Sequence, residues 1–368
     1  MCSRKRHSIF CILPPHILTE VAKNGTPEQR EIALRALAID HSVRTNRLTH
    51  ALLGGMKVAH ANVAAMGATP QKHRTISDAQ HTENLPGQTV RTEGQAAVSD
   101  VAVNQAYDGL GDTFDFYLGA YQRNSIDNAG LALKASVHYG QDYDNAFWDG
   151  QQMVFGDGDN TIFVGFTGCL DVIGHELTHG VTGSEANLTY QGQAGALNES
   201  ISDVFGSLVK QYKLKQTADQ ADWLIGAGLL APGIHGVALR SMKAPGTAYN
   251  DPTLGKDPQP ADMAHYVKTT ADSGGVHINS GIPNHAFYLV ATSIGGQAWV
   301  KAGQIWYDTL LDSRLKQNAN FSAFANLTIL NASHRYGSTS AERKAVADAW
   351  RQVGVKVSGQ AVAAGAGS

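Results

Sequence analysis

The chain has 368 residues, and its 29 Lys and Arg against 32 Asp and Glu give a formal charge of −3. Hydrophobic content of 43% and charged content of 17% are typical of a folded globular protein and exclude a disordered chain. The near balance of charge offers no general field for nucleic acid or an anionic membrane, so we expect neither as a partner. No stretch approaches the roughly 18 apolar residues of a membrane span.

The cysteine content and the N-terminal sequence indicate in which cellular compartment the protein is made. The three cysteines, Cys2, Cys11 and Cys169, cannot all pair within the chain, which argues against a disulfide framework. The apolar run 9–13 is shorter than the roughly 7–15 residues that a secretory signal requires. We therefore expect cytoplasmic synthesis with non-classical secretion as an option, and the final location stays open.

A short helix is predicted near the N-terminus. Thr26 can cap it, Pro27 suits its first position, and Gln29 completes a capping box. An apolar stripe at helical spacing follows, made of Ile32, Ala36, Ile39 and Val43. One such helix cannot form a core, so it must dock on another surface. The segment from Ala51 to about Arg74 has no clear period and indicates a linker.

The main body begins with a helix and strands and becomes mostly helical after residue 170. The predicted helix buries Val103, Tyr107, Leu110, Phe114, Tyr117 and Tyr121 on one face. Apolar residues then alternate from Leu131 to Tyr139, which predicts a strand. The run 156–160 has turn chemistry, with calcium binding as the less favoured alternative. Two later helices are predicted, one with a stripe from Leu197 to Tyr212 and one over 283–294.

The segment 171–179 contains the pattern His-Glu-x-x-His. On a helix, His175 and His179 are four residues apart, so both imidazoles project from one face and can bind one metal ion. Glu176 lies beside the metal rather than on it, where it can take a proton from the attacking water. The pattern favours a metal site over the alternative of two buried structural histidines.

A second helix, predicted to begin at Asn198, contains two acidic residues. Glu199 and Asp203 are four residues apart on a face distinct from the apolar stripe. Glu199 can be the third metal ligand and leave the fourth position open, as a catalytic zinc site requires. Asp203, with Asn198, can orient the ligands, since a carboxylate that accepts the other ring proton of a ligand histidine fixes its orientation. Two solvated carboxylates are the alternative.

A third stretch, 272–281, combines glycines with one histidine. Glycine permits unusual backbone angles and close approach to a ligand. Asp272, five residues before His277, can hold the imidazole by a hydrogen bond and favour its charged form. Such a histidine could stabilise an oxyanion, although a Gly-rich loop with one histidine is common.

In order and spacing, 175–179, 195–203 and 274–281 resemble the three signature stretches of the thermolysin family. Asn145–Trp148 is similar to that family's substrate-binding edge strand, and the resemblance extends from about Ile76 to Val353. It implies an α+β, two-lobed fold in which a β-rich N-terminal lobe and a helical C-terminal lobe are joined by the helix with the histidine pair.

The resemblance also implies a catalytic centre. His175, His179 and Glu199 would bind one catalytic Zn²⁺, a ligand set for which thermolysin is a standard example, and Glu176 would be the general base. Two further groups would stabilise the tetrahedral intermediate, namely Tyr190 and His277, the latter held by Asp272.

Substrate contacts are implied in the same way. Asn145 and Ala146 would pair with a peptide or protein substrate in the manner of a neighbouring strand, and Arg240 would hold a substrate carbonyl. Val172 and Leu239 would line an apolar pocket for the side chain after the cleaved bond. The resemblance therefore implies cleavage on the N-terminal side of bulky apolar residues.

The run Pro14–Leu18 and the short helix resemble the brief propeptide of protealysin-like members. On this basis we expect an inhibitory, self-removed propeptide. The expected division is 1–50 propeptide, 51–75 flexible linker with the processing site, 76–184 N-terminal lobe, 185–355 C-terminal lobe and 356–368 disordered tail. A Cys11 thiolate could occupy the open zinc position. Simple apolar packing of Cys11 beside Pro14 is the favoured alternative.

The sequence departs from thermolysin at its double calcium site. Lys210, Leu224 and Ala227 stand where carboxylate ligands would be needed, and an ammonium group opposes a dication. We expect this site to be lost and Lys210 to form a salt bridge instead. As for function, peptide hydrolysis is favoured over a catalytically inactive peptide-binding protein, because the ligands, the base and the oxyanion groups occur together.

Overall fold

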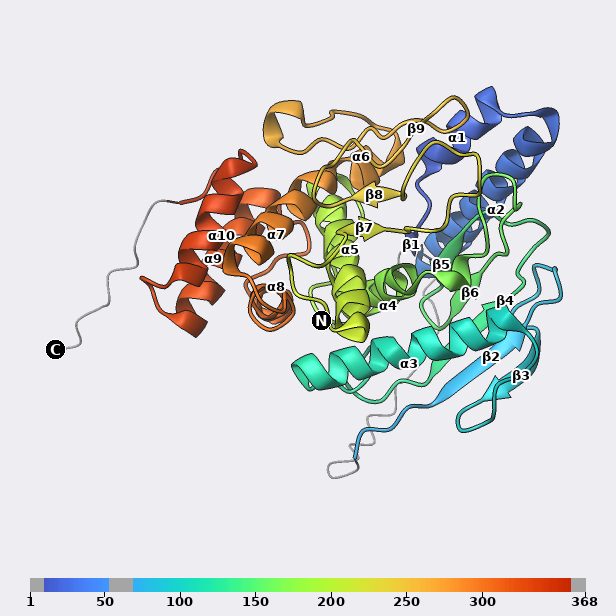
Figure 1. Cartoon of the computed structure of the whole chain (residues 1–368), viewed down its shortest axis with the longest axis horizontal. Coiled ribbons are helices and arrows are strands. Elements are labelled where there is room, and N and C mark those ends of the chain that lie inside the picture. Colours follow the sequence, from blue (N-terminus) through green and yellow to red (C-terminus); the bar gives the residue numbers. More distant parts are fainter. Residues whose placement is uncertain (1–9, 53–68, 359–368) are drawn as a thin grey trace.

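The computed structural model of the chain describes residues 10–52 and 69–358 (Figure 1). The described helices are α1 (Pro15–Asn24), α2 (Pro27–Leu52), α3 (Val101–Tyr121), α4 (Leu170–Ser184), α5 (Gly192–Leu214), α6 (Asp272–Asn279), α7 (Gly281–Ile294), α8 (Ala302–Leu311), α9 (Phe321–Tyr336) and α10 (Ala341–Gln352), with short 3₁₀ turns η1 (Phe166–Gly168) and η2 (Met263–His265). The strands are β1 (Phe10–Cys11), β2 (Arg74–Asp78), β3 (Gln88–Thr92), β4 (Leu133–Val137), β5 (Ala146–Trp148), β6 (Met153–Phe155), β7 (Leu224–Ile225), β8 (Arg240–Ser241), β9 (Asn250–Asp251) and β10 (Gly255–Lys256).

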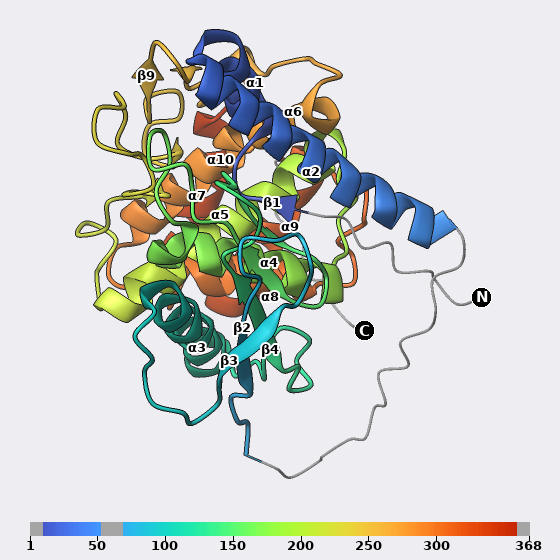
Figure 2. The same cartoon turned by 90° about the vertical axis from the view of Figure 1, so that its right-hand side faces the viewer.

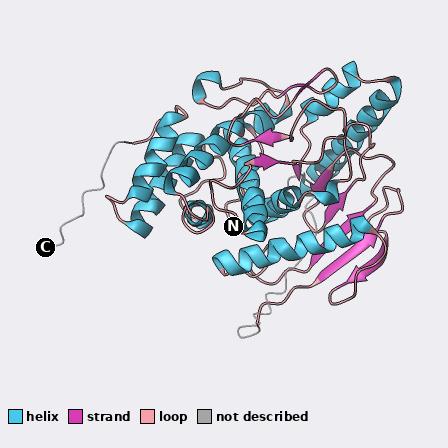
Figure 3. Ribbon diagram, in the orientation of Figure 1, coloured by secondary structure: helices cyan, strands magenta, loops and turns pink. Residues whose placement is uncertain are grey.

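The first lobe contains a six-stranded mixed sheet in the order β1-β5-β6-β4-β2-β3. Its strands are magenta in Figure 3. Strand β4 is parallel to β2 and β6, and the other pairs are antiparallel. The predicted alternation is confirmed at β4, where Leu133, Ala135 and Val137 are buried. Ser136 on the opposite face is buried as well, and its hydroxyl donates to the Pro86 carbonyl at 2.8 Å. That face of β4 is therefore covered at Ser136 and exposed at Lys134.

Helix α3 packs between the sheet and helices α4 and α5. The six residues expected on its buried face are all buried. The Tyr117 hydroxyl lies 2.7 Å from that of Thr178 on α4, which fixes α3 beside the helix with the histidine pair.

Helices α4 and α5 pack closely where each has a glycine. A Cβ atom at Gly206 would lie 2.4 Å from the Asp171 carbonyl oxygen, and one at Gly174 would lie 3.1 Å from the Gly206 Cα. The missing side chains allow the two backbones to meet. This approach sets the histidines of α4 opposite Glu199 of α5.

The predicted start of α5 at Asn198 was wrong, because the helix begins at Gly192. Glu199 and Asp203 are buried, which excludes the alternative of two solvated carboxylates. The first turn has no side-chain cap and lies against α6, where a Cβ atom at Gly195 would meet Val276 at 2.4 Å and one at Gly274 would lie 3.1 Å from Gly192 N. A cap-based prediction could not find such a start.

The second lobe is helical from α7 to α10. Helix α7 confirms the helix predicted at 283–294, and Gly295 ends it with φ 73°. Trp306 and Trp350 stack in the lobe with ring centroids 6.0 Å apart. The small ladders β7–β8 and β9–β10 lie between α5 and α6, in the earlier part of the same lobe, and were not predicted.

The N-terminal segment is a pair of helices preceded by strand β1, and Figure 2 shows α1 and α2 across the face turned to the viewer. The capping box is confirmed, with Thr26 N–H donating to Gln29 Oε1 at 2.9 Å and Gln29 N–H donating to Thr26 Oγ1 at 3.2 Å. Helix α2 extends beyond the predicted 26–43, and α1 was missed. Helix α1 is short and has no side-chain cap, so Pro15 in its first turn was the only sequence signal for a helix there.

The two helices pack on each other and bury Ile17, Leu18, Ala33, Ala36 and Ile39 in the core. The side chain of Val43 and residues 53–68, which contain most of the expected linker, lie outside the described part of the chain. Residues 356–358 of the expected tail contact α9, since Ser358 N–H donates to Asn326 at 2.8 Å. The rest of that tail also lies outside the description.

Candidate active site

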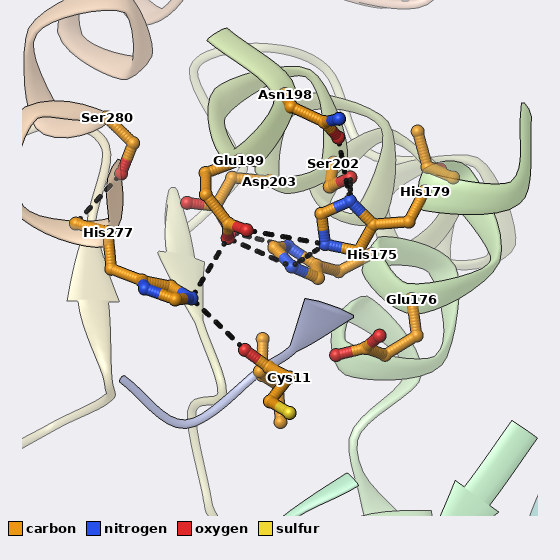
Figure 4. Close-up of polar contacts among 12 residues, drawn as sticks. Cys11, His175, Glu176, His179, Asn198, Glu199, Ser202, Asp203, His277 and Ser280 are labelled. Carbon is orange, nitrogen blue, oxygen red and sulfur yellow. Dashed lines mark hydrogen bonds and ion pairs between the residues drawn. The ribbon is translucent and has the colours of Figure 1, made fainter. Parts of the chain in front are cut away.

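Two histidines and a glutamate meet where α4 crosses α5 (Figure 4). The Nε2 atoms of His175 and His179 are 3.0 Å apart. The Glu199 carboxylate oxygens lie 3.5 Å from the first and 3.6 Å from the second. All three side chains are buried, and Glu199 Oε2 has no hydrogen-bond partner among the described residues. Two imidazole nitrogens facing a buried carboxylate are a donor set that suits zinc.

The second ring nitrogen of each histidine is held from α5. Asp203 Oδ1 lies 2.8 Å from His175 Nδ1, and Asn198 Oδ1 lies 2.9 Å from His179 Nδ1. The Ser202 hydroxyl lies 2.9 Å from the same atom of His179. These contacts turn both Nε2 atoms toward Glu199. Sequence reasoning did not single out Ser202, although it lies in the stretch 195–203 that carries the family resemblance.

Asp203 is itself fixed by two side chains. Arg240 donates to its two oxygens at 2.9 and 2.8 Å, and Asn284 donates at 2.8 Å. Burial opposes ionisation of Asp203, but the charge of Arg240 lowers its pKa to about 2. The contact from Asn284 was missed, since nothing in the sequence indicates that the start of α7 reaches this carboxylate.

Glu176 is fully buried beside the histidine pair. Its Oε2 accepts a hydrogen bond of 3.0 Å from Trp148 N–H, and its Oε1 has no hydrogen-bond partner among the described residues. Burial raises the pKa of Glu176 well above its usual range. A carboxylate with a raised pKa can both take up and return a proton near neutral pH.

His277, Asp272 and Tyr190 form a second group on the other side of Glu199. His277 Nδ1 lies 2.6 Å from Asp272 Oδ1, and His277 Nε2 lies 3.1 Å from the Tyr190 hydroxyl. Tyr190 also donates to Glu199 at 2.5 Å. Burial opposes the charged form, but the Asp272 carboxylate raises the pKa of His277.

The glycine-rich stretch is a kinked helix, α6, rather than a plain loop. The backbone has positive φ at Asp272 (52°), Ser273 (50°), Gly274 (86°) and Gly275 (74°). This left-handed run turns Asp272 back onto His277, whose backbone N–H also donates to Asp272 Oδ2 at 2.9 Å. The prediction that these glycines permit unusual angles is confirmed.

The N-terminal strand occupies the edge of the sheet at this site. Strand β1 pairs with β5, so that Cys11 faces Phe147. Ile12 N–H donates to the Ala146 carbonyl at 3.2 Å, and Leu13 N–H donates to Asn145 Oδ1 at 3.0 Å. The predicted backbone-binding residues therefore already hold a strand of the same chain.

The carbonyl groups of that strand also face the site. Arg240 Nη1 donates to the Ile12 carbonyl at 3.0 Å, and His277 Nε2 donates to the Cys11 carbonyl at 3.2 Å. Figure 4 shows the Cys11 carbonyl directed at His277 and its sulfur turned away from the histidine pair. A thiolate–zinc contact of Cys11 stays a prediction. Val172 and Leu239, expected in an apolar pocket, are buried at 0% and 1% exposure.

Helix α2 adds a contact that sequence reasoning missed. The Asp40 carboxylate accepts from Tyr143 at 2.6 Å and from Asn145 Nδ2 at 3.0 Å. Asp40 is buried, and it follows Ile39 of the predicted stripe directly. The only sequence signal for this contact was the position of an acidic residue next to the apolar stripe of the predicted helix.

Lys210 lies between two carboxylates. Its ammonium group is 3.2 Å from Asp171 and 2.7 Å from Asp222. Asp171 is buried, and the ammonium supplies its counter-charge. The predicted salt bridge of Lys210 is present in this geometry.

Comparison with known proteins decides the family. Residues 56–183 match the thermolysin metallopeptidase catalytic domain, and residues 186–355 match the alpha-helical domain of the same metallopeptidases. The chain belongs to the thermolysin family. Its fold, a β-containing N-terminal region followed by a helical domain, is the expected one.

Relatives of this thermolysin-family chain are similar over nearly its whole length. It is 53% identical over 359 residues to an extracellular metalloprotease of Pectobacterium carotovorum subsp. carotovorum, covering 96% of this chain and 98% of that one. It is 47% identical over 348 residues to Protease PrtS of Photorhabdus sp. (strain Az29), covering 94% and 92%. The solved precursor of protealysin, a metalloproteinase from Serratia proteamaculans, matches with a TM-score of 0.85 at 55% identity, covering 94% and 100%.

These matches establish the class of enzyme. The chain is a zinc endopeptidase of the thermolysin family, and the relatives named above are proteases rather than inactive binding proteins. Within the described residues, no helix is long and apolar enough to cross a membrane.

Proposed function

We propose that this chain is the precursor of a zinc endopeptidase and that its own N-terminal segment inhibits it by occupying the substrate position. One observation carries the proposal: residues 11–13 already make the backbone contacts that Asn145, Ala146, Arg240 and His277 would make with a substrate. The likeness to a solved protealysin precursor supports it.

The proposed zinc ligands are His175, His179 and Glu199, with Glu176 as the base rather than a ligand. Tetrahedral zinc with bonds of about 2.0–2.1 Å separates its ligand atoms by about 3.3 Å. The Glu199 oxygens lie 3.5 and 3.6 Å from the two Nε2 atoms, which agrees with that spacing. Glu176 instead accepts a backbone hydrogen bond from Trp148, which suits a base held beside the metal.

When bound, zinc supplies a Lewis acid that polarises the substrate carbonyl and the attacking water. Glu176 takes a proton from that water and delivers it to the leaving amine. His277 and Tyr190 donate to the oxygen on which negative charge develops, and Asp272 keeps His277 oriented and charged. Each of these groups is buried or half-buried, which strengthens the hydrogen bonds relative to water.

The register of the inhibitory strand identifies the bond it presents. The Cys11 carbonyl faces His277, the proposed oxyanion-stabilising group, and the next carbonyl, that of Ile12, faces Arg240. The Cys11–Ile12 bond therefore takes the place of the bond that a substrate would present. An isoleucine on its C-terminal side agrees with the proposed cleavage before bulky apolar residues, in a pocket lined by Val172 and Leu239.

The proposed division is 1–50 inhibitory propeptide, 51–75 linker with the processing site, 76–184 first lobe, 185–355 second lobe and 356–368 tail. The proposal includes loss of the double calcium site, supported by the Lys210 ion pairs with Asp171 and Asp222. The proposal includes no nucleic-acid partner, because the nearly balanced net charge provides no general attraction for nucleic acid.

Two measurements test the proposal. Freshly made wild-type protein should shorten to a new N-terminus between about Leu48 and Arg74, while a zinc-loaded Glu176→Ala chain stays full length. The shortened form should hydrolyse casein, and a zinc chelator should abolish that activity. Equal shortening of the inactive variant in a protease-free preparation would refute self-processing. Full activity of the unshortened chain would refute inhibition.

A further inference from the structure

A second group of metal-binding side chains lies outside the active site, at one end of the sheet. His81 follows β2, His138 follows β4, and Asp157 follows β6. The His81 backbone N–H donates to the His138 carbonyl at 2.8 Å, which joins the first two segments. Three chain segments far apart in the sequence are thus held together at this point.

The side-chain atoms of this group have the spacing of metal ligands. His138 Nδ1 lies 2.9 Å from the Asp157 carboxylate, and His81 Nδ1 lies 3.4 Å from the same carboxylate. The ligand atoms of all three lie within 4.8 Å of one another. Ligands around a tetrahedral ion are separated by about 3.3 Å, so small side-chain shifts would admit one.

A fourth residue provides an independent observation. Asp100 accepts from His138 Nε2 at 2.8 Å, so the ring is fixed from the side opposite the cluster. Its other oxygen caps α3 by accepting from Val103 N–H at 3.2 Å. A metal-binding histidine typically has this arrangement, with one nitrogen on the metal and the other donating to an anchored carboxylate.

We propose that His81, His138 and Asp157 bind a divalent transition-metal ion in addition to the catalytic zinc. Two imidazoles and one carboxylate favour ions such as Zn²⁺, Ni²⁺ or Co²⁺, whereas calcium needs six or more oxygen ligands. The His81 side chain is 55% exposed, so water completes the coordination. The ion would link the loop after β2 to the ends of β4 and β6.

The competing interpretation is a protonated His138 that bridges two carboxylates without any metal. Hydrogen bonding to Asp157, and then to Asp100, raises the pKa of His138 to about 9. The ion must displace this proton, so binding is best measured at pH 8 or above. The role of His81 separates the two interpretations, because only the metal site requires its side chain.

The experiment is a calorimetric titration of Ni²⁺ into the zinc-loaded, full-length Glu176→Ala chain, which is used because it does not digest itself. We expect one saturable Ni²⁺ per chain without release of the catalytic zinc. His81→Ala and Asp157→Asn should each abolish it. Asp100→Asn should weaken it by about 10–100-fold, as loss of an orienting carboxylate does, while the amide still caps α3.

His265→Ala is the matched control. His265 is an exposed histidine 2.8 Å from Asp262, but it belongs to neither of the metal-competent groups found in the described residues. This variant should bind Ni²⁺ as the parent does. Absence of a saturable site in the parent, or binding that survives both His81→Ala and Asp157→Asn, would overturn the proposal. Equal loss in the control would overturn it too.

Discussion

Asp40 of helix α2 accepts a hydrogen bond of 3.0 Å from Asn145, the residue proposed to bind substrate backbone. The Asn145 side chain is thereby held from two sides, since its Oδ1 accepts from Leu13 N–H at 3.0 Å. One part of the N-terminal segment takes the place of a substrate, and another fixes the residue that receives it. The inhibitory contact therefore extends beyond strand β1.

Replacing Asp40 with Ala should weaken inhibition, because Tyr143 and Asn145 would lose a buried acceptor. A buried donor left without its partner costs about 1–3 kcal/mol, so the loss of two such bonds should accelerate self-processing at least about tenfold. The half-time of conversion to the short form measures this. Glu31→Ala, at an exposed position of the same helix, is the control and should process at the parental rate. Parental kinetics in Asp40→Ala would mean that this contact contributes nothing to inhibition.

Replacing Glu176 with Ala should leave zinc bound but lower turnover of the processed enzyme by about 10²–10⁴, the usual contribution of a positioned base. Because the variant cannot process itself, its N-terminal segment has to be removed by another protease first. Glu199→Ala should instead lose zinc, since two protein ligands remain. Zinc content and casein turnover of each variant are the measurements. Stoichiometric zinc together with near-normal turnover in Glu176→Ala would exclude Glu176 as the base.

Calcium removal should change stability little. The ammonium of Lys210 lies 2.7 Å from Asp222 and 3.2 Å from Asp171, so it supplies the positive charge there. A calcium-selective chelator, with zinc content checked, should leave Tm almost unchanged. Lys210→Glu is the informative variant: it removes the ion pairs and should make Tm calcium-dependent. A large drop in Tm of the parent on calcium depletion would reveal a calcium site elsewhere.

How far the sequence predicts the molecule depends on the kind of signal. The histidine pair and the pair Glu199 and Asp203 could be found because the helical period places residues four apart on one face, and the family resemblance joined the two pairs into one site. The α2 cap was found because its chemistry is local. Asp40, Asn284 and the role of the Cys11 carbonyl could not be found, because each depends on which distant segment docks there. The start of α5 was missed for the same reason, since it rests on packing rather than on a cap.

Acid should loosen the N-terminal segment through His16 of α1. Its Nε2 lies 3.1 Å from the Tyr249 hydroxyl, and its Nδ1 is buried without a hydrogen-bond partner among the described residues. Burial lowers the pKa of His16 to about 4, from 6.5 when exposed. The docked segment therefore excludes a proton that the released segment binds. Docking is fully stable above pH 6.5 and weakens as the pH falls toward 4.

By this linkage the loss at pH 5 is at most about 2 kcal/mol. The test compares the full-length Glu176→Ala chain with its His16→Gln derivative, in which a neutral amide replaces the imidazole beside Tyr249. The difference in Tm in favour of His16 should shrink between pH 7 and pH 5. A difference that stays constant, or grows in favour of His16 at the lower pH, would show that His16 does not couple docking to protonation.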